Sequence, residues 1–252
     1  MTENKPMRPK RLSIDEIKNG CVYITNGDET ETRICVINEE FRQGFDIIKS
    51  HKDHTKSVTF WGSARLPESH EDYQRALRLS RRIAGELGYS IATGGGPGIM
   101  EAGNRGAYEM GKPSLGLTIK LPMEQNTNKY VTEEIPFYFF FTRKVLMAYS
   151  AEAYLYFPGG FGTFDELFEI LTLVQTGKIS KVPIILVGRK FWEPLDKVIK
   201  ETMLRDFQTI SPEDLNFYTI TDDEDEILEI VKNAPMREEE KTKNPRERIF
   251  CL

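Results

Sequence analysis

Residues 158–166 read PGGFGTFDE and place three glycines just ahead of two carboxylates. They follow an apolar run, AYLYF at 153–157, and lead into an amphipathic stretch. Glycine lets a backbone approach a ligand closely, and the N-terminus of a helix presents unpaired N–H groups that suit a phosphate. Thr163 stands where its hydroxyl could cap the helix or bond to a phosphate oxygen. The stretch therefore predicts an anion site at a strand-to-helix turn.

The two acids behind this turn are Asp165 and Glu166. Carboxylates in a first helical turn are ordinary, because they complement the helix dipole. Adjacent residues point about 100° apart on a helix, so only one of the two is expected to face a ligand. A carboxylate beside a phosphate site repels its ligand unless it serves a cation that forms elsewhere on that ligand. An oxocarbenium-like sugar carbon is such a cation, which indicates glycosidic-bond chemistry.

A second glycine turn, TGGGPGIM at 93–100, also follows an apolar strand and opens a helix. Neither turn is a standard dinucleotide fingerprint, because the third glycine of a G-x-G-x-x-G frame would fall on Glu101 or on Asp165. The string GAYEMGKP (106–113) ends in proline and sits at a helix end, so it does not fit a P-loop. Tight strand-to-helix packing explains one glycine turn, whereas two turns in one sheet favour a ligand site.

The stretch FFTRKVLM at 140–147 adds a basic pair, Arg143 and Lys144, at a further strand-to-helix junction. One interpretation is a solvated pair of cations. The other places Arg143 in the ligand pocket, where its planar fork could hold a phosphate, a base or a carboxylate.

Strand-like and helix-like stretches alternate between these motifs. The apolar strands are apolar on both faces, which predicts an α/β fold of the Rossmann-like, doubly wound kind, with a mainly parallel sheet and helices on both faces. Ligands in such sheets lie beyond the C-terminal ends of the strands, where the glycine turns fall. Strands are expected at 57–63, 89–93, 113–119, 153–157, 182–188 and 216–221, and helices at 71–88, 99–111, 142–150, 163–177, 191–204 and 222–233.

The two ends of the chain differ from this pattern. Residues 1–55 are expected to form an N-terminal extension with short strands at 21–25 and 32–37 and a helix from Asn38, its possible cap. Residues 56–234 form the main domain, and 235–252 a charged tail.

Composition limits the classes of protein. In 252 residues, 39% hydrophobic content supplies a sizeable core, and a net charge of −5 gives no footprint for nucleic acid. The N-terminus lacks the apolar segment of a signal peptide, and no run of 18 apolar residues predicts a membrane span. Cys21, Cys35 and Cys251 are interpreted as reduced thiols of a cytoplasmic protein, with a Cys21–Cys35 disulfide as the alternative.

Together the motifs resemble the LOG ("Lonely Guy") family of nucleoside 5′-monophosphate phosphoribohydrolases. The similarity covers roughly residues 57–205, and GSARLP after the first strand is more like the bacterial branch than the plant one. Glu101 stands where plant members commonly continue with glycine. The signature P-G-G-x-G-T-x-x-E is matched at 158–166, the R-K pair at 143–144, the G-G-G-x-x-G-I/L-M turn at 94–100 and the first G-S at 62–63.

The resemblance implies hydrolysis of the N-glycosidic bond of a nucleoside 5′-monophosphate, such as AMP or a cytokinin riboside monophosphate, to free base and ribose 5-phosphate. It implies Glu166 and Arg143 as the catalytic pair, a homodimer or larger homo-oligomer, and neither metal nor cofactor, because the leaving group is an aromatic base. The residues that it assigns to substrate binding are Gly62, Ser63, Gly94, Gly95, Gly96, Gly98, Lys144, Gly159, Gly160, Gly162 and Thr163.

Two other functions remain open at this point. Carriers that bind a nucleotide or molybdopterin without turnover have similar glycine turns, although a carrier has no evident need for Glu166. A third interpretation is an interaction module whose N-terminal extension docks a partner. Lysine decarboxylation is not supported, since it needs a pyridoxal-phosphate lysine site and these motifs suit a phosphate and a sugar.

Overall fold

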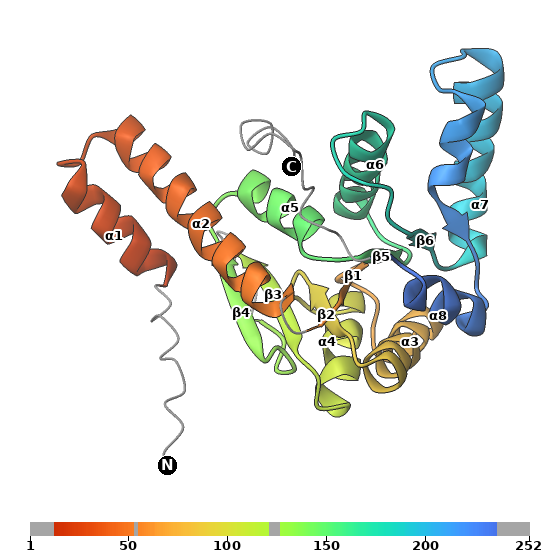
Figure 1. Ribbon diagram of the computed structural model, residues 1–252, viewed down its shortest axis with the longest axis horizontal. Coiled ribbons are helices and arrows are strands. Elements are labelled where there is room, and N and C mark those ends of the chain that lie inside the picture. The colour runs from red at the N-terminus through yellow and green to blue at the C-terminus, as the bar shows by residue number, and fades with distance from the viewer. Residues whose placement is uncertain (1–12, 53–54, 121–126, 236–252) are drawn as a thin grey trace.

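A parallel sheet forms the centre of the molecule (Figure 1). The computed structural model describes residues 13–52, 55–120 and 127–235. Within these ranges the sheet has seven strands in the order β4-β3-β2-β1-β5-β6-β7, and every adjacent pair is parallel. The strands are β1 Ser57–Trp61, β2 Ser90–Thr93, β3 Ser114–Ile119, β4 Glu133–Phe137, β5 Ala153–Tyr156, β6 Ile184–Leu186 and β7 Thr219–Ile220.

Helices cover both faces of this sheet, which confirms the predicted doubly wound α/β fold. Alternate residues of a strand point to opposite faces, and β5 accordingly sends Leu155 into one core and Tyr154 into the other. One core lies under α3 Glu71–Leu87, α4 Ile99–Glu109 and α8 Glu224–Lys232. The other lies under α5 Phe140–Tyr149, α6 Phe161–Gln175 and α7 Arg189–Val198, the last continued by a π-helical stretch, Ile199–Asp206.

The direction of winding reverses between β1 and β5. From β1 the chain builds outward through β2 and β3 to β4, and from β5 it builds the opposite way through β6 to β7. Such a reversal leaves a crevice beyond the C-terminal strand ends, which is where open α/β sheets bind ligands. The glycine turns after β1, β2 and β5 all fall there.

The N-terminal extension is helical, so the strands expected at 21–25 and 32–37 are wrong. The structure has α1 Ile14–Ile24 and α2 Glu29–Lys52, and Asn38 lies inside α2 and does not cap it. β-branched residues favour strands locally, but the buried side chains recur at helical spacing, as Ile14, Ile17 and Cys21 do. The overlooked signal is S-x-x-E: Ser13 and Glu16 form a capping box that starts α1.

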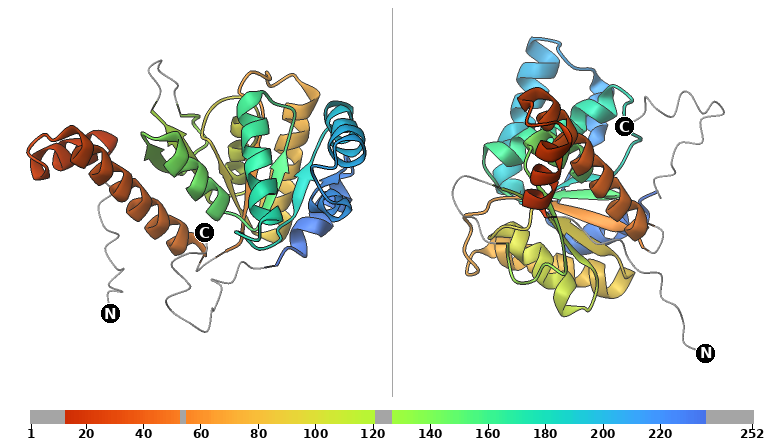
Figure 2. Two further views of the ribbon diagram at one scale, coloured as in Figure 1. Left: turned by 90° about the horizontal axis from the view of Figure 1, so that it is seen from above. Right: turned by 90° about the vertical axis from the view of Figure 1, so that its left-hand side faces the viewer.

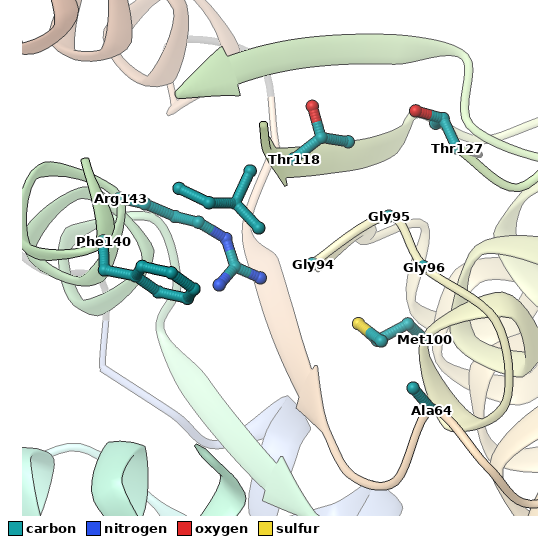
Figure 3. Close-up of a pocket in the computed structure, with 10 residues that line it drawn as sticks. Ala64, Gly94, Gly95, Gly96, Met100, Thr118, Thr127, Phe140 and Arg143 are labelled. Carbon is teal, nitrogen blue, oxygen red and sulfur yellow. The ribbon is translucent and has the colours of Figure 1, made fainter. Parts of the chain in front are cut away.

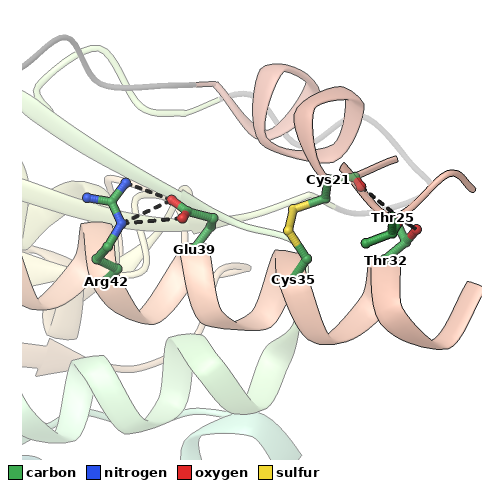
Figure 4. The surroundings of a disulfide bond; sticks show 6 residues. All are labelled: Cys21, Thr25, Thr32, Cys35, Glu39 and Arg42. Carbon is green, nitrogen blue, oxygen red and sulfur yellow. Dashed lines mark hydrogen bonds and ion pairs between the residues drawn. A yellow bond between two sulfur atoms is a disulfide. The ribbon is translucent and has the colours of Figure 1, made fainter. Parts of the chain in front are cut away.

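A disulfide joins Cys21 and Cys35 across the α1–α2 pair, so the expectation of reduced thiols is wrong for these two residues (Figure 4). The two helices pack side by side, which brings the Cα atoms of Cys21 and Cys35 to 5.7 Å from each other, within the range for a disulfide. A hydrogen bond of 2.6 Å between the Thr25 and Thr32 hydroxyls links the same helices next to the turn. Cys251 lies outside the described residues, as does the tail from 236 onward.

No helix in the described ranges is long and apolar enough to cross a bilayer.

Candidate functional site

Backbone hydrogen bonds tie the three turns of the crevice together through Ser63, which follows β1 after Gly62. The Ser63 N–H donates to the Pro158 carbonyl at 3.0 Å, at the start of the turn after β5. The Ser63 carbonyl accepts from the Ile99 N–H at 3.0 Å, at the start of α4. Gly62 is packed against Ile99, since a Cβ there would approach its side chain to 2.8 Å. Gly62 and Ser63 therefore lie between the two glycine turns and connect them.

The turn after β2 needs glycine for conformation and for space. Gly95 and Gly98 have φ of +73° and +68°, which side chains strongly disfavour. A Cβ on Gly98 would also overlap the Ser63 carbonyl. Gly94 has a different reason: a Cβ there would overlap the guanidinium of Arg143. This turn is therefore shaped to admit a cationic side chain from another element.

A buried polar network holds this turn in place, and no sequence motif predicted it. The Asn128 side-chain amide donates to the Gly95, Gly96 and Asn104 oxygens at 3.1, 3.0 and 2.9 Å. Asn104 Oδ1 also accepts from the Thr93 hydroxyl at 2.6 Å. The only sequence signal was a polar residue, Asn104, on the apolar face of α4. Asn128 lies in a loop without periodicity, which gave no signal.

The turn after β5 differs, because two of its glycines are required by neither conformation nor packing. Gly159 is packed tightly, since its Cβ would overlap the Thr163 side chain. Around a Cβ on Gly160 or Gly162 there is nothing within 4 Å, and neither residue has positive φ. Gly160 precedes α6 without any side-chain cap, and Thr163 is buried in the first turn. The first N–H groups of α6 have no partner within the helix and lie next to open space.

Arg143 extends from α5 into the crevice. It lines a cavity of about 220 Å³ (Figure 3), into which its guanidinium points toward the Gly94–Gly96 turn. Its Nε donates to the Leu117 carbonyl at 2.7 Å, which fixes the side chain at the end of β3. Burial lowers the pKa of Arg143, and the charge of Glu166 opposes this shift. The cavity is lined by Ala64, Gly94, Gly95, Gly96, Met100, Thr118, Ile119, Thr127, Phe140 and Arg143.

Glu166 is a buried carboxyl, with 7% of its surface exposed. Burial raises its pKa to about 8, although the charges of Arg143 and Lys144 act in the opposite direction. It extends from the second turn of α6 near Arg143, and the two interact through their charges without a direct ion pair. A carboxyl with such a pKa exchanges its proton near neutral pH, as groups in catalytic sites commonly do.

Lys144 points to α6 and not into the cavity. Its Nζ lies 2.9 Å from Asp165 and 3.2 Å from Glu169. Burial lowers the pKa of Lys144, but the hydrogen bonds that Lys144 donates to these two acids outweigh this effect and leave its pKa above the ordinary value. The predicted pair therefore divides: Arg143 enters the cavity and Lys144 joins α5 to α6.

The predicted residues thus fall into two neighbouring groups. Arg143 and the turn at 94–96 line one cavity, with Ser63 beside Ala64 at its edge. Residues 159–163 and Glu166 are absent from its lining. They belong to the adjoining turn and the start of α6, which the Ser63–Pro158 hydrogen bond and the charge of Arg143 join to the first group.

Comparisons with known proteins identify the family of this chain. A family model described as "Possible lysine decarboxylase" matches residues 100–231. The Arabidopsis thaliana protein named cytokinin riboside 5′-monophosphate phosphoribohydrolase LOG2 is 30% identical over 135 residues, which cover 51% of this chain and 63% of that relative. The Rhodococcoides fascians protein named cytokinin riboside 5′-monophosphate phosphoribohydrolase is 27% identical over 156 residues, covering 61% and 79%.

Solved structures share the fold. The molybdenum cofactor carrier protein of Chlamydomonas reinhardtii superposes with a TM-score of 0.52 at 22% identity, covering 72% of this chain and 98% of its own. The molybdenum cofactor binding protein of Rippkaea orientalis gives 0.51 at 20%, covering 70% and 93%. Because the family model spans more than half of the sequence and the named relatives come from plants and from a bacterium, the chain belongs to the LOG family.

Proposed function

We propose that this protein hydrolyses the N-glycosidic bond of a nucleoside 5′-monophosphate, such as AMP or a cytokinin riboside monophosphate, to free base and ribose 5-phosphate. The observation that carries the proposal is the pairing of two unlike niches. Gly160 and Gly162 leave the N-terminus of α6 open to an anion, and Glu166, one turn further on, is a buried carboxyl near an arginine.

The anion niche holds the 5′-phosphate in this proposal. Helix N–H groups and the helix dipole bind phosphate without a basic side chain, and open space around Gly160 and Gly162 is what such a group needs. The phosphate supplies binding energy away from the reacting bond, which orients the ribose. Gly62, Ser63 and residues 94–98 line the cleft for the rest of the nucleotide.

Glu166 and Arg143 carry out the chemistry. The electron pair of the glycosidic bond leaves with the base, and positive charge forms on the sugar carbon. Ionised Glu166 stabilises that charge and takes the proton that the attacking water loses. This proton then passes to the departed base, which restores the carboxylate, while Arg143 holds the substrate and favours departure of the base. Lys144, paired with Asp165 and Glu169, holds α6 against α5. The family model covers Arg143 and Glu166, but its description as a possible lysine decarboxylase does not fit their chemistry, which suits a sugar cation and not an amino-acid adduct.

The carboxylate form of Glu166 sets the expected pH dependence. Its pKa of about 8 means that the protonated form prevails in the free protein at pH 7. We expect kcat/KM to rise with pH until about 8 and then to level off. A profile that falls between pH 6 and 8 would indicate that Glu166 acts as an acid.

The direct test uses Glu166→Gln with AMP as substrate, following adenine by chromatography and AMP binding by calorimetry. Loss of a general base or charge stabiliser costs about 10²–10⁴ in turnover. Retained binding with lost adenine release supports the role, and undiminished release refutes it. AMP binding by the wild-type protein without any turnover would indicate a carrier. Equal turnover of adenosine and AMP would overturn the phosphate niche.

The proposal includes a homodimer or larger homo-oligomer. Large apolar side chains stand exposed near the turn of the α1–α2 pair and around the start of α5, and clustered exposure of this kind is typical of interaction surfaces. Sedimentation velocity at micromolar concentration reports the assembly, and a monomer would contradict this part of the proposal. The exposed side chains are Val22, Tyr23, Ile24, Ile34, Tyr138, Phe140 and Phe141.

A further inference from the structure

The helix α2 lies along α5, the helix that carries Arg143 (Figures 1 and 2). The two helices approach closely at Gly44, where a Cβ would overlap the side chain of Leu146. Phe45 packs edge-on against Tyr149, with ring centroids 5.2 Å apart. Further along α2, Ile47 and Ile48 join the main core. Part of the extension is therefore packed into the same core as the site.

One carboxylate from this helix is buried at the N-terminus of α5. Glu40 is 2% exposed, and it accepts hydrogen bonds from the Tyr138 N–H and the Thr142 hydroxyl, both at 2.5 Å. Burial raises its pKa, and the hydrogen bonds from Thr142 and from the backbone of Tyr138 and Phe139 oppose the shift. A buried carboxylate with these partners is held in one position.

The N-terminus of α5 has no cap of its own. Its N-cap residue, Phe139, makes no side-chain cap hydrogen bond, and the first turn contains no acid. Unpaired N–H groups at a helix start need a partner, and a negative charge there complements the dipole. Glu40 lies about a hundred residues earlier in the chain. Its carboxylate accepts from the N–H of the N-cap residue Phe139 and from the N–H of Tyr138 directly before it, and it places a negative charge at this helix start.

The capped turn is also the turn that enters the cavity. Phe140 and Arg143 line it, and Arg143 directly follows Thr142, which Glu40 binds. The guanidinium end of Arg143 is fixed separately by the Leu117 carbonyl. The backbone end therefore depends on where the N-terminus of α5 lies.

We propose that Glu40 is a positioning residue: its carboxylate caps α5 and thereby sets the place of Arg143 in the cavity, so that α2 belongs to the scaffold of the active site. The inference rests on the proposed function for its kinetic consequence, but the capping itself is testable without activity. Nothing about Glu40 requires contact with substrate.

The first experiment compares Glu40→Ala with Glu39→Ala. Glu39 is the neighbouring acid on α2 and pairs with Arg42 near the surface at 2.7 Å, so it controls for loss of a carboxylate from this helix. Hydrogen–deuterium exchange at the Tyr138 amide should accelerate in the first variant and stay unchanged in the second. Unchanged exchange in Glu40→Ala would overturn the capping assignment, whether or not the protein cleaves AMP.

The second experiment asks whether Glu40 acts through Arg143. We expect Glu40→Ala to lower kcat/KM for AMP by about 10- to 100-fold, as small displacements of positioned groups do. In an Arg143→Ala background the same change should have little further effect, because residues that act as a unit are not additive. Equal fold losses in both backgrounds would refute the positioning role, and absence of adenine release by wild-type protein would refute only the proposed function.

Two milder variants keep the proposal testable if Glu40→Ala fails to fold. In Glu40→Gln the side-chain oxygen can still accept from the Tyr138 N–H and the amide can donate to the Thr142 hydroxyl, so activity should stay within about threefold of wild type. Thr142→Val, which removes one donor to Glu40, should give a smaller loss than Glu40→Ala. If Glu40→Ala does not fold, a Glu40→Gln or Thr142→Val protein with wild-type exchange at Tyr138 and activity below a tenth of wild type would overturn the proposal.

Discussion

Replacing Glu166 by glutamine should stabilise the folded protein at neutral pH while it removes turnover. The two carboxyl oxygens are buried beside Arg143, and burial raises the pKa from 4.5 to about 8. Between these values the folded protein keeps a proton that the unfolded chain has released. The free energy of unfolding therefore falls as the pH rises, by about 1.4 kcal/mol for each pH unit in this window.

The size of this change in unfolding free energy follows from the pH range between the two pKa values. At pH 7 the wild-type protein has lost about 3 kcal/mol relative to pH 4.5, whereas a glutamine does not titrate and loses nothing. At pH 5 the two proteins should have nearly equal stability, because protonated glutamate and glutamine are close in shape. For a chain of this size, 3 kcal/mol corresponds to roughly 6–12 °C in Tm.

Thermal unfolding of both proteins from pH 5 to pH 8.5 measures this difference directly. Asp165→Asn is the matched control, since it removes the adjacent carboxylate, whose side chain is exposed and paired with Lys144. We expect the control to change stability by about 1 kcal/mol or less, without the growth with pH. A difference in stability between wild type and Glu166→Gln that stays constant over this pH range would refute the assignment of Glu166 as a buried carboxyl with a raised pKa.

Three further predictions concern the surroundings of the site. Gly160→Val should raise KM for AMP at least about tenfold with Tm nearly unchanged, because the new side chain enters the open space that we propose for the phosphate. A lower Tm would show that packing, and not ligand access, needs this glycine. Asn128→Ala should lower the free energy of unfolding by about 2–4 kcal/mol, since it leaves the Gly95, Gly96 and Asn104 oxygens without this donor; chemical denaturation measures it. Reduction of the Cys21–Cys35 disulfide, which closes a loop of sequence separation 14, should cost about 3 kcal/mol, measured against a Cys21→Ser/Cys35→Ser variant that no longer responds to reductant.

Most of the fold between 57 and 234 was predictable from local patterns. The edge strand β4 was not among the expected strands, because its residues EEIPF include two acids and a proline. Helix α3 ends at Gly88 in the left-handed conformation, as its sequence predicts, and buried strands carry continuous apolar runs. Boundaries were less exact: α6 begins at Phe161, which is 97% exposed, two residues before the expected start. Glycines at 160 and 162 hid that first turn because glycine disfavours helix interiors.

The extension and the support of the site were not predictable in the same way. Apolar residues between 21 and 37 fit a strand as well as a helix, and only the capping box at Ser13 and packing on α5 decide between them. The roles of Glu40 and Asn128 depend on pairing across 98 and 33 residues of chain. No local pattern encodes such a distance, so a motif can identify Arg143 but not what holds it.

In the proposed reaction, two charges of the substrate act on Glu166 in opposite directions, and their balance changes as the glycosidic bond breaks. A phosphate at the N-terminus of α6 adds negative charge near Glu166, a carboxyl that burial already keeps protonated in the ground state. Positive charge on the ribose carbon acts in the opposite direction and lowers the pKa of Glu166 as the glycosidic bond breaks. Ionised Glu166 is therefore most favourable when the sugar cation exists, which is differential stabilisation of the transition state and not of the bound substrate.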